Sequence, residues 1–198
     1  SAWAVEAEVI DVATRPFRKV PGLVGIDATI AATESGAQAW IRTTDFELEL
    51  PRVYREPIVL PSVTGTLAGR WKRDALFLEQ GLFLAEAPAH AAKVQFAMDI
   101  PLSKGSSSPL FMRLSAAVVD APLAISDAYV PYRMPERSYQ WLKTALTDGH
   151  IDEAIFLWHG GLRPYGDAGQ TMQLAAELSD VSLDYQLGWP PALISGGQ

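Results

Sequence analysis

Strict alternation of apolar and polar residues constrains this chain most, because it recurs along nearly its whole length. The cleanest example is 93–100, Lys-Val-Gln-Phe-Ala-Met-Asp-Ile, in which every second residue is apolar. A period of two residues is that of a β-strand with two unlike faces. Similar segments recur about every ten residues, with Gly, Ser, Asp or Pro between them, which favours a long antiparallel meander.

The pattern divides the chain into five parts of a single β-rich module. These are a first strand group at 1–50, a Pro-rich connector at 51–61, a second strand group at 62–130, a helix at 134–148 and closing strands at 151–190. Proline cannot donate to a ladder, so the connector is predicted to be a loop or a sheet edge. Strand-like sequence stands close to both ends, which predicts a piece excised from a longer protein.

One helix is predicted among the strands. Pro135 suits its first position, Glu136 favours the positive end of its dipole, and Gly149 follows its last turn. We expect this helix to cap one face or end of the sheet through Tyr139, Trp141, Leu142 and Leu146. The predicted fold class is mainly β with one short α-helix, arranged as a long sheet that forms a groove or a half-open sandwich.

Composition and charge exclude several classes of protein. With 48% hydrophobic and 20% charged residues in 198, the chain is long and apolar enough to fold as one domain. Its net charge of −7 argues against nucleic acid as a partner. The absence of cysteine excludes disulfides, thiolate catalysis and Cys-type zinc sites. No apolar run approaches the ~20 residues that cross a bilayer.

Four residues carry side chains that metals prefer, namely His150, Asp152, Glu153 and His159. Their spacing fits no zinc signature, and the two histidines are predicted at opposite ends of one strand. We therefore expect polar strand-end residues here and no metal site. His90 stands between alanines and is predicted to be a surface histidine rather than a base.

Glu47 and Glu49 are the only candidates for paired catalytic carboxylates that the pattern suggests. They lie on one face of one strand, ~7 Å apart by strand rise, in surroundings that alternate like a solvated strand face. No Ser–His–Asp grouping, phosphate loop or dinucleotide fingerprint accompanies them. The sequence predicts neither an enzyme nor a cofactor.

The predicted strands carry a large apolar face, and something must cover it. One side of two neighbouring strands carries Val94, Phe96, Met98, Leu110, Met112 and Leu114. A second sheet or the helix would cover this side, or it would remain an open groove for a ligand, and the sequence does not separate the filled from the open arrangement. The six Trp are scattered one per element, which favours core filling over a carbohydrate-binding surface.

The spacing of one set of residues resembles that of a known family. The set comprises Tyr129/Pro131, Met134-Pro135, Trp141-Leu142, Ala145-Leu146, Gly149, Ala154/Phe156, 183–185 and 188–190. It resembles the AsmA-like envelope proteins of Gram-negative bacteria, in particular the YhdP branch, most strongly over 127–190. The segments 45–51 and 63–67 resemble that family's repeated strand units. Residues 163–166 depart from it, because Arg-Pro-Tyr-Gly stands where an aromatic pair around a proline is usual.

The resemblance implies a bridge-like carrier that moves phospholipid between the inner and outer membranes along a curved, apolar β-groove. It implies a periplasmic location, with the full-length protein anchored in the inner membrane. Partners would be phospholipid acyl chains and adjoining segments of the same full-length protein, and open sheet edges would allow self-association. Under this hypothesis Val94, Phe96, Met98, Leu110, Met112 and Leu114 line the lipid path. The alternative is a structural or interaction β-domain with a filled core, and a carbohydrate-binding domain comes third.

Overall fold

The computed structural model describes residues 2–16, 21–51, 53–103, 110–125, 129, 135, 137, 140–141, 145–162, 169–183 and 192–195. Its elements are β1 (Ala4–Thr14), β2 (Gly22–Thr33), β3 (Gly36–Glu49), β4 (Ile58–Trp71), β5 (Ala75–Ala87), β6 (His90–Pro101), β7 (Phe111–Pro122), the 3-10 turn η1 (Leu123–Ile125), β8 (Leu146–Gly161), β9 (Thr171–Leu183) and β10 (Ala192–Ile194).

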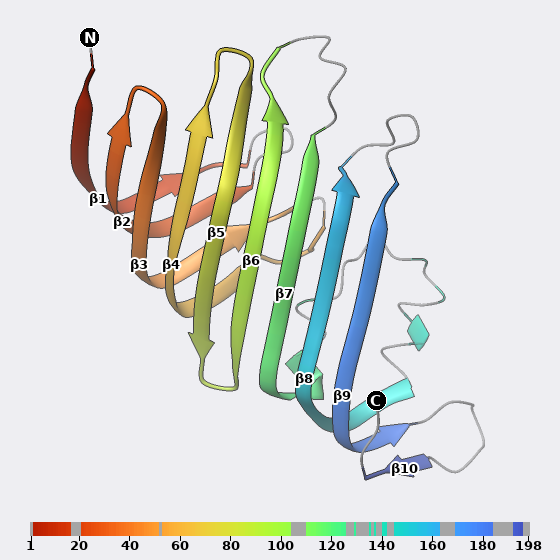
Figure 1. The fold of residues 1–198 in the computed structure, drawn as a ribbon. Coiled ribbons are helices and arrows are strands. Elements are labelled where there is room, and N and C mark those ends of the chain that lie inside the picture. Colours follow the sequence, from red (N-terminus) through yellow and green to blue (C-terminus); the bar gives the residue numbers. More distant parts are fainter. Residues whose placement is uncertain are drawn as a thin grey trace.

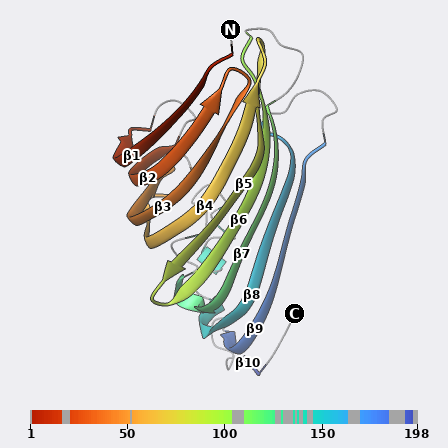
Figure 2. The same cartoon turned by 60° about the vertical axis from the view of Figure 1, so that its left-hand side comes forward.

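The strands form one antiparallel sheet in which each strand pairs with the next strand along the chain. The spatial order runs from β1 to β10 without a crossover (Figure 1). This is the meander that the alternating pattern predicts, so the mainly β fold class is confirmed. Figure 2 shows that the sheet is curved rather than flat.

The sheet stays open, and its surface area shows how little of it is covered. The chain exposes 13309 Å², whereas a compact monomer of 21.5 kDa exposes about 9,200 Å². Among the described residues, the buried hydrophobic cluster is small and comprises Ala121, Leu123, Ile151 and Val181, where η1 packs against β7–β9. The described strands belong to one continuous sheet that stays open.

Several strands bend sharply, and residues in left-handed conformations lie in the bent regions. In β1 to β3 these are Asp11, Gly25 and Asp45, with φ of 51°, 74° and 55°. The register shifts between Val9 and Val12, on either side of Asp11. A residue with positive φ in a bulge bends its strand, so these residues account for the lower parts of β1–β4 turning back behind the sheet in Figure 1.

The Pro-rich connector is shorter than predicted, because β4 begins at Ile58 and includes Pro61. The register pairs Thr44 with Ser62 and Phe46 with Leu60, which leaves Pro61 facing Asp45. Asp45 has a φ of 55°, so the ladder is already interrupted there. An inner strand tolerates this proline because its missing N–H falls at the bend.

The predicted helix at 134–148 is also shorter. Arg137, Gln140, Trp141 and Ala145 are helical, but Leu146 is the first residue of β8. The helix therefore ends before Leu146, which is paired with Leu183 on β9. Positions 134, 136, 138–139 and 142–144 of the predicted helix, which include Tyr139 and Leu142, lie outside the described residues. The strand pairing of β8 overrides the helical spacing at Leu146.

Candidate functional site

Two rows of directly paired residues cross the sheet from β1 to β9, and every residue in them is apolar or glycine. Side chains of paired residues on neighbouring strands point to the same face of a sheet. The first row is Val9, Ala28, Ile41, Gly65, Phe83, Val94, Ala116, Phe156 and Leu174. The second row is Ala7, Ile30, Ala39, Leu67, Gly81, Phe96, Leu114, Trp158 and Met172. We call the face that carries both rows the inner face.

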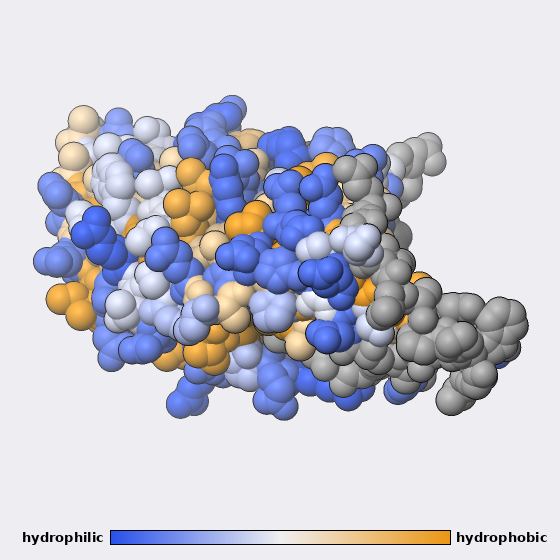
Figure 3. Space-filling model, turned by 90° about the horizontal axis from the view of Figure 1, so that it is seen from below, coloured by the Kyte–Doolittle hydropathy of each residue, from blue (hydrophilic) through white to orange (hydrophobic). Residues whose placement is uncertain are grey.

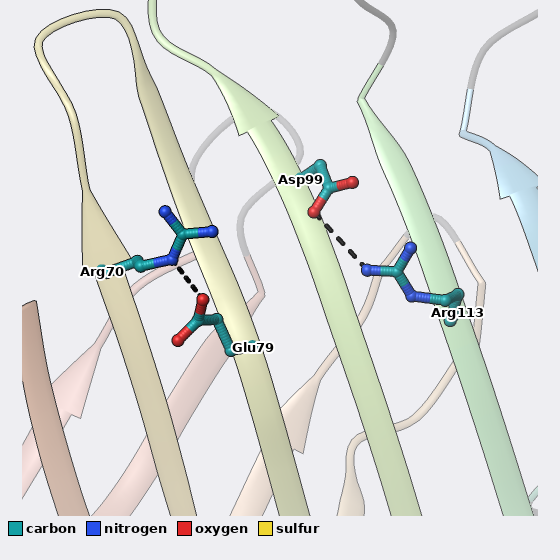
Figure 4. Close-up of polar contacts among 4 residues, drawn as sticks. All are labelled: Arg70, Glu79, Asp99 and Arg113. Carbon is teal, nitrogen blue, oxygen red and sulfur yellow. Dashed lines mark hydrogen bonds and ion pairs between the residues drawn. The ribbon is translucent and has the colours of Figure 1, made fainter.

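The opposite face, here called the outer face, is mixed. The row between the two apolar rows there is Glu8, Thr29, Trp40, Thr66, Leu82, Gln95, Ser115, Leu157 and Gln173. Ion pairs link Arg70 to Glu79 and, at 3.5 Å, Arg113 to Asp99. Figure 4 shows these four side chains in front of the sheet, with the folded-back parts of other strands behind it.

The inner face therefore lies on the concave side of the sheet. The ion pairs mark the outer face, and the lower ends of β1–β4 turn back on the other side (Figures 1 and 4). Seen from below in Figure 3, hydrophobic side chains lie among hydrophilic ones, and grey atoms cover part of the view. The concave side of the sheet is thus apolar whereas the outer face is mixed, and we call the concave, apolar side the trough.

Most of the predicted groove residues are brought together on this inner face. Phe96 faces Leu114 directly, and Met98 faces Met112. Val94 is paired with Ala116 in the same way. Leu110 lies just before β7, where its carbonyl accepts a hydrogen bond from the Leu162 N–H at 2.9 Å. The shared face is thus established for five of the six residues, and contact with lipid remains a prediction.

The lining is accessible to different degrees along the trough. Near its middle, Phe96 and Leu114 are partly covered by their neighbours. At the edges, Met172 and Leu174 on β9 are 67% and 74% exposed, and Val5 on β1 is 56% exposed. Large exposed apolar areas of this kind mark a surface that binds another molecule.

Polar groups on the inner face are few among the described residues. Thr43 is 2% exposed, and its hydroxyl donates to its neighbour's carbonyl. Trp158 has a buried Nε1 with no hydrogen-bond partner. An unpartnered buried donor costs about 1–3 kcal/mol, so an acceptor oxygen in the trough would stabilise it.

A further polar residue of the inner face is His90, which is partly buried. Its Nε2 lies 2.7 Å from the Tyr129 hydroxyl, and its Nδ1 is buried without a partner. Burial lowers the pKa of His90. The pKa of Tyr129 is raised by burial and by the nearby Tyr54, whose own pKa is also raised by burial. The cluster is therefore neutral around pH 7.

The residues considered for chemistry are not assembled into a reactive site. The Nε2 of His150 lies 3.1 Å from Oδ1 of Asp120. The ring of His159 instead packs edge-on against the Phe111 ring, with 5.0 Å between the ring centroids. Over the described part of the chain, no three His, Cys, Asp or Glu side chains converge as metal ligands would. Glu47 and Glu49 lie in β3, where they are paired with Val24 and Gly22 of β2.

A hollow in the sheet surface shares four lining residues, Gly81, Phe96, Leu114 and Trp158, with the second apolar row. It is an open groove of about 520 Å³ that crosses β5–β9, and most of its lining residues, among them Gln95, Arg113, Ser115 and Gln173, belong to the outer face.

Of the residues predicted to cap the trough from the helix, Trp141 is described, and its side chain is 50% exposed. Capping by Tyr139, Trp141 and Leu142 stays a prediction. Within the described residues, no helix has the length and apolar character needed to cross a bilayer.

The fold and lining define a class of protein: an open, curved β-sheet whose concave face is apolar and carries no assembled catalytic group among the described residues. The model of the YhdP protein family matches residues 2–195, nearly the whole chain. The chain therefore belongs to the YhdP family, a family of envelope proteins related to lipid transport, as the resemblance predicted. No curated protein and no solved structure matched the chain.

Sequence reasoning missed how far the lining extends. It singled out two strands, whereas the rows continue to Val9 on β1 and Leu174 on β9. The alternation of Val24–Ala32 carried the same signal, but the face to which each strand contributes depends on register. The burial of Trp158 Nε1 and of His90 Nδ1 had no sequence signal.

Proposed function

We propose that this chain is a segment of a periplasmic bridge-like carrier that moves phospholipid between the inner and outer membranes. Acyl chains would lie in the trough, and the full-length protein would be anchored in the inner membrane. The observation that carries the proposal is the pair of uninterrupted apolar rows on the concave side from β1 to β9.

The dimensions of the rows favour movement over a fixed binding site. Strands spaced about 4.8 Å apart make each row roughly 38 Å long, whereas one leaflet of hydrocarbon is only about 15 Å thick. Each methylene transferred from water into the trough stabilises binding by about 0.8 kcal/mol, wherever along the row it lies. An acyl chain would thus be retained by the trough while it moves, because each apolar contact that it loses is replaced by an equivalent one further along the row.

The sheet edges support a continuation of the trough into neighbouring segments. Within the described residues, β1 pairs with β2 alone and β10 pairs with Val181–Leu183 of β9, so both edges have backbone groups that no described strand pairs with. The exposed side chains of Val5, Met172 and Leu174 stand on these edges. Adjoining segments of the same full-length protein would cover them and extend both rows.

Photocrosslinking tests the lipid path directly. A photoreactive residue is placed in cells at Phe96 or Met112 on the inner face and, as a matched control, at Lys93 or Arg113 on the outer face of the same strands. We expect phospholipid adducts from the inner positions well above those from the outer ones. Equal labelling from both faces would refute the assignment of the inner face.

Native mass spectrometry distinguishes the lipid carrier from the alternative, a structural or interaction β-domain that never contacts lipid. The chain is purified without detergent, and the masses of co-purified molecules are measured. Retained phospholipid supports conduction, and a chain that carries none and also fails to crosslink would favour the structural role.

A further inference from the structure

Two glycines on the inner face lie directly under aromatic rings of the next strand. Gly81 on β5 is paired with Phe96 on β6, and a Cβ placed on Gly81 would stand 2.6 Å from Cε1 and 2.7 Å from Cζ of that ring. Carbon atoms at optimal contact are about 3.5–4.0 Å apart, so the Phe96 ring occupies the space of the missing methyl group.

A related arrangement lies one strand earlier. Gly65 on β4 is paired with Phe83 on β5, and a Cβ placed on Gly65 would meet both the backbone carbonyl oxygen of Leu82 and, at 2.6 Å, Cδ1 of the Phe83 ring. The rings of Phe83 and Phe96 are parallel within 5°, with centroids 5.9 Å apart. Each ring therefore leans toward the preceding strand and covers a glycine there.

Backbone conformation does not explain the glycine at position 81. The residues with positive φ are elsewhere, at Gly25, Gly149 and Gly160 among the described glycines. The three nearest atoms to a Cβ at position 81 all belong to the Phe96 ring, and none to the backbone. The backbone φ at position 81 is thus compatible with alanine, and the Phe96 ring is the nearest obstacle to its methyl group.

A ring that leans over a glycine takes up little height above the sheet. Side chains in strands usually stand roughly perpendicular to the sheet. A perpendicular Phe96 would extend into the middle of the trough, where it would occupy the space proposed for an acyl chain. Phe83 and Phe96 are only partly buried, so their upper faces remain accessible as a floor.

We propose that Gly81 and Gly65, by letting the Phe96 and Phe83 rings lie low, determine the depth of the trough at β4–β6 and so determine whether straight acyl chains fit there. This inference rests on the proposed function and adds the residues that control the passage. Gly81 is the position at which it is tested most cleanly, because the three atoms nearest to a methyl group there all belong to the Phe96 ring.

The test is a double-mutant cycle on the whole chain. Binding of a phosphatidylethanolamine with one fluorescent-labelled dodecanoyl chain is titrated for the unmodified chain, Gly81→Ala, Phe96→Ala and the double variant. We expect Gly81→Ala to weaken binding about tenfold, the factor that loss of roughly two buried methylenes gives. In the Phe96→Ala background the same change should have no effect, because no ring remains to be displaced.

Gly169→Ala is the matched control, since a Cβ at Gly169 has no atom within 4 Å. It should bind the probe as the unmodified chain does. Proton NMR supplies a readout that needs no lipid: the α-protons of Gly81 should be shifted upfield by the ring above them, and Phe96→Ala should abolish the shift.

The outcomes separate the two proposals. If Gly81→Ala binds as tightly as the unmodified chain, or weakens binding equally with and without Phe96, the inference is wrong while the proposed function stands. If the unmodified chain binds no probe, the proposed function falls and this inference falls with it. An unshifted Gly81 resonance would refute the ring geometry by itself.

Discussion

At the scale of single residues, aspartate provides the left-handed conformations that bend the strands. Asp11, Asp45, Asp120 and Asp180 have φ between 51° and 55°, and they are the only non-glycine residues with positive φ in the described chain. Asparagine tolerates this conformation equally well, yet the chain contains none. The short polar side chain of aspartate makes a local bend without the unfolded-state entropy of a glycine.

Substitution of Asp45 tests this role. Asp45→Val places a β-branched residue at a φ of 55° and should destabilise the fold by about 1–3 kcal/mol. Asp45→Asn keeps a side chain that tolerates the conformation and should change stability by less than about 0.5 kcal/mol. Urea unfolding measures both, and equal stabilities for the two variants would show that the bend does not depend on this residue.

His90 gives the chain a pH-dependent stability. Burial lowers its pKa below that of the unfolded chain, so the unfolded state binds more protons as the pH falls below about 6.5. The contribution of His90 to stability is therefore complete at neutral pH and decreases with acidification. We expect the unmodified chain to lose more stability between pH 7.5 and pH 5 than His90→Gln, which does not titrate.

Thermal unfolding at the two pH values measures that difference. Gln also retains a group that can bond to the Tyr129 hydroxyl, so the comparison isolates the proton. His159→Gln serves as the control, because His159 is exposed beside Phe111. The same pH dependence in all three proteins would assign the effect to other groups.

At the scale of elements, the two sheet edges differ in their ability to pair with another strand. The outer face of β1 carries Glu6 and Glu8, whose charges oppose pairing with an identical strand. The inner faces of both edges carry exposed apolar side chains, namely Val5 on β1 at 56% and Met172 and Leu174 on β9 at 67% and 74%. We propose that two copies associate through β9, whose apolar side chains are the more exposed.

Leu174→Lys should shift the chain toward the monomer. Like charges that face each other across a strand pair cost up to about 1 kcal/mol, which is a several-fold change in the association constant. Sedimentation over a range of protein concentrations measures the effect. Gln95→Lys adds the same charge on the central strand β6 and should leave association unchanged; a similar effect of both variants would exclude the β9 edge.

At the scale of the whole molecule, the open sheet leaves a measurable thermodynamic signature. The chain exposes 13309 Å² when folded, so unfolding exposes roughly 18,000 Å² more, against roughly 22,000 Å² for a compact protein of the same mass. The slope of unfolding free energy against urea concentration scales with that area. We expect a slope about one fifth lower than for a compact protein of this size. A slope of the compact size would show that the trough closes in solution.

Some of the architecture follows from local pattern alone. Alternation in segments such as 93–100 predicts strands, the short turns between them predict antiparallel neighbours, and both are confirmed from β1 to β10. The common face of Phe96 and Leu114 follows likewise, because their strands are neighbours and the alternation of each fixes its two faces. These features depend on residues close in sequence, so local chemistry determines them.

The rest depends on which residues meet across strands, and only the tertiary structure decided it. Pro61 lies in an inner strand because it faces the bend at Asp45, and Leu146 is in a strand because it pairs with Leu183. Likewise, the glycine at position 81 is explained by the Phe96 ring of the neighbouring strand, which lies over it. The sequence alone thus determined that the chain makes a sheet with one apolar face, and register and curvature decided that this face lines an open trough.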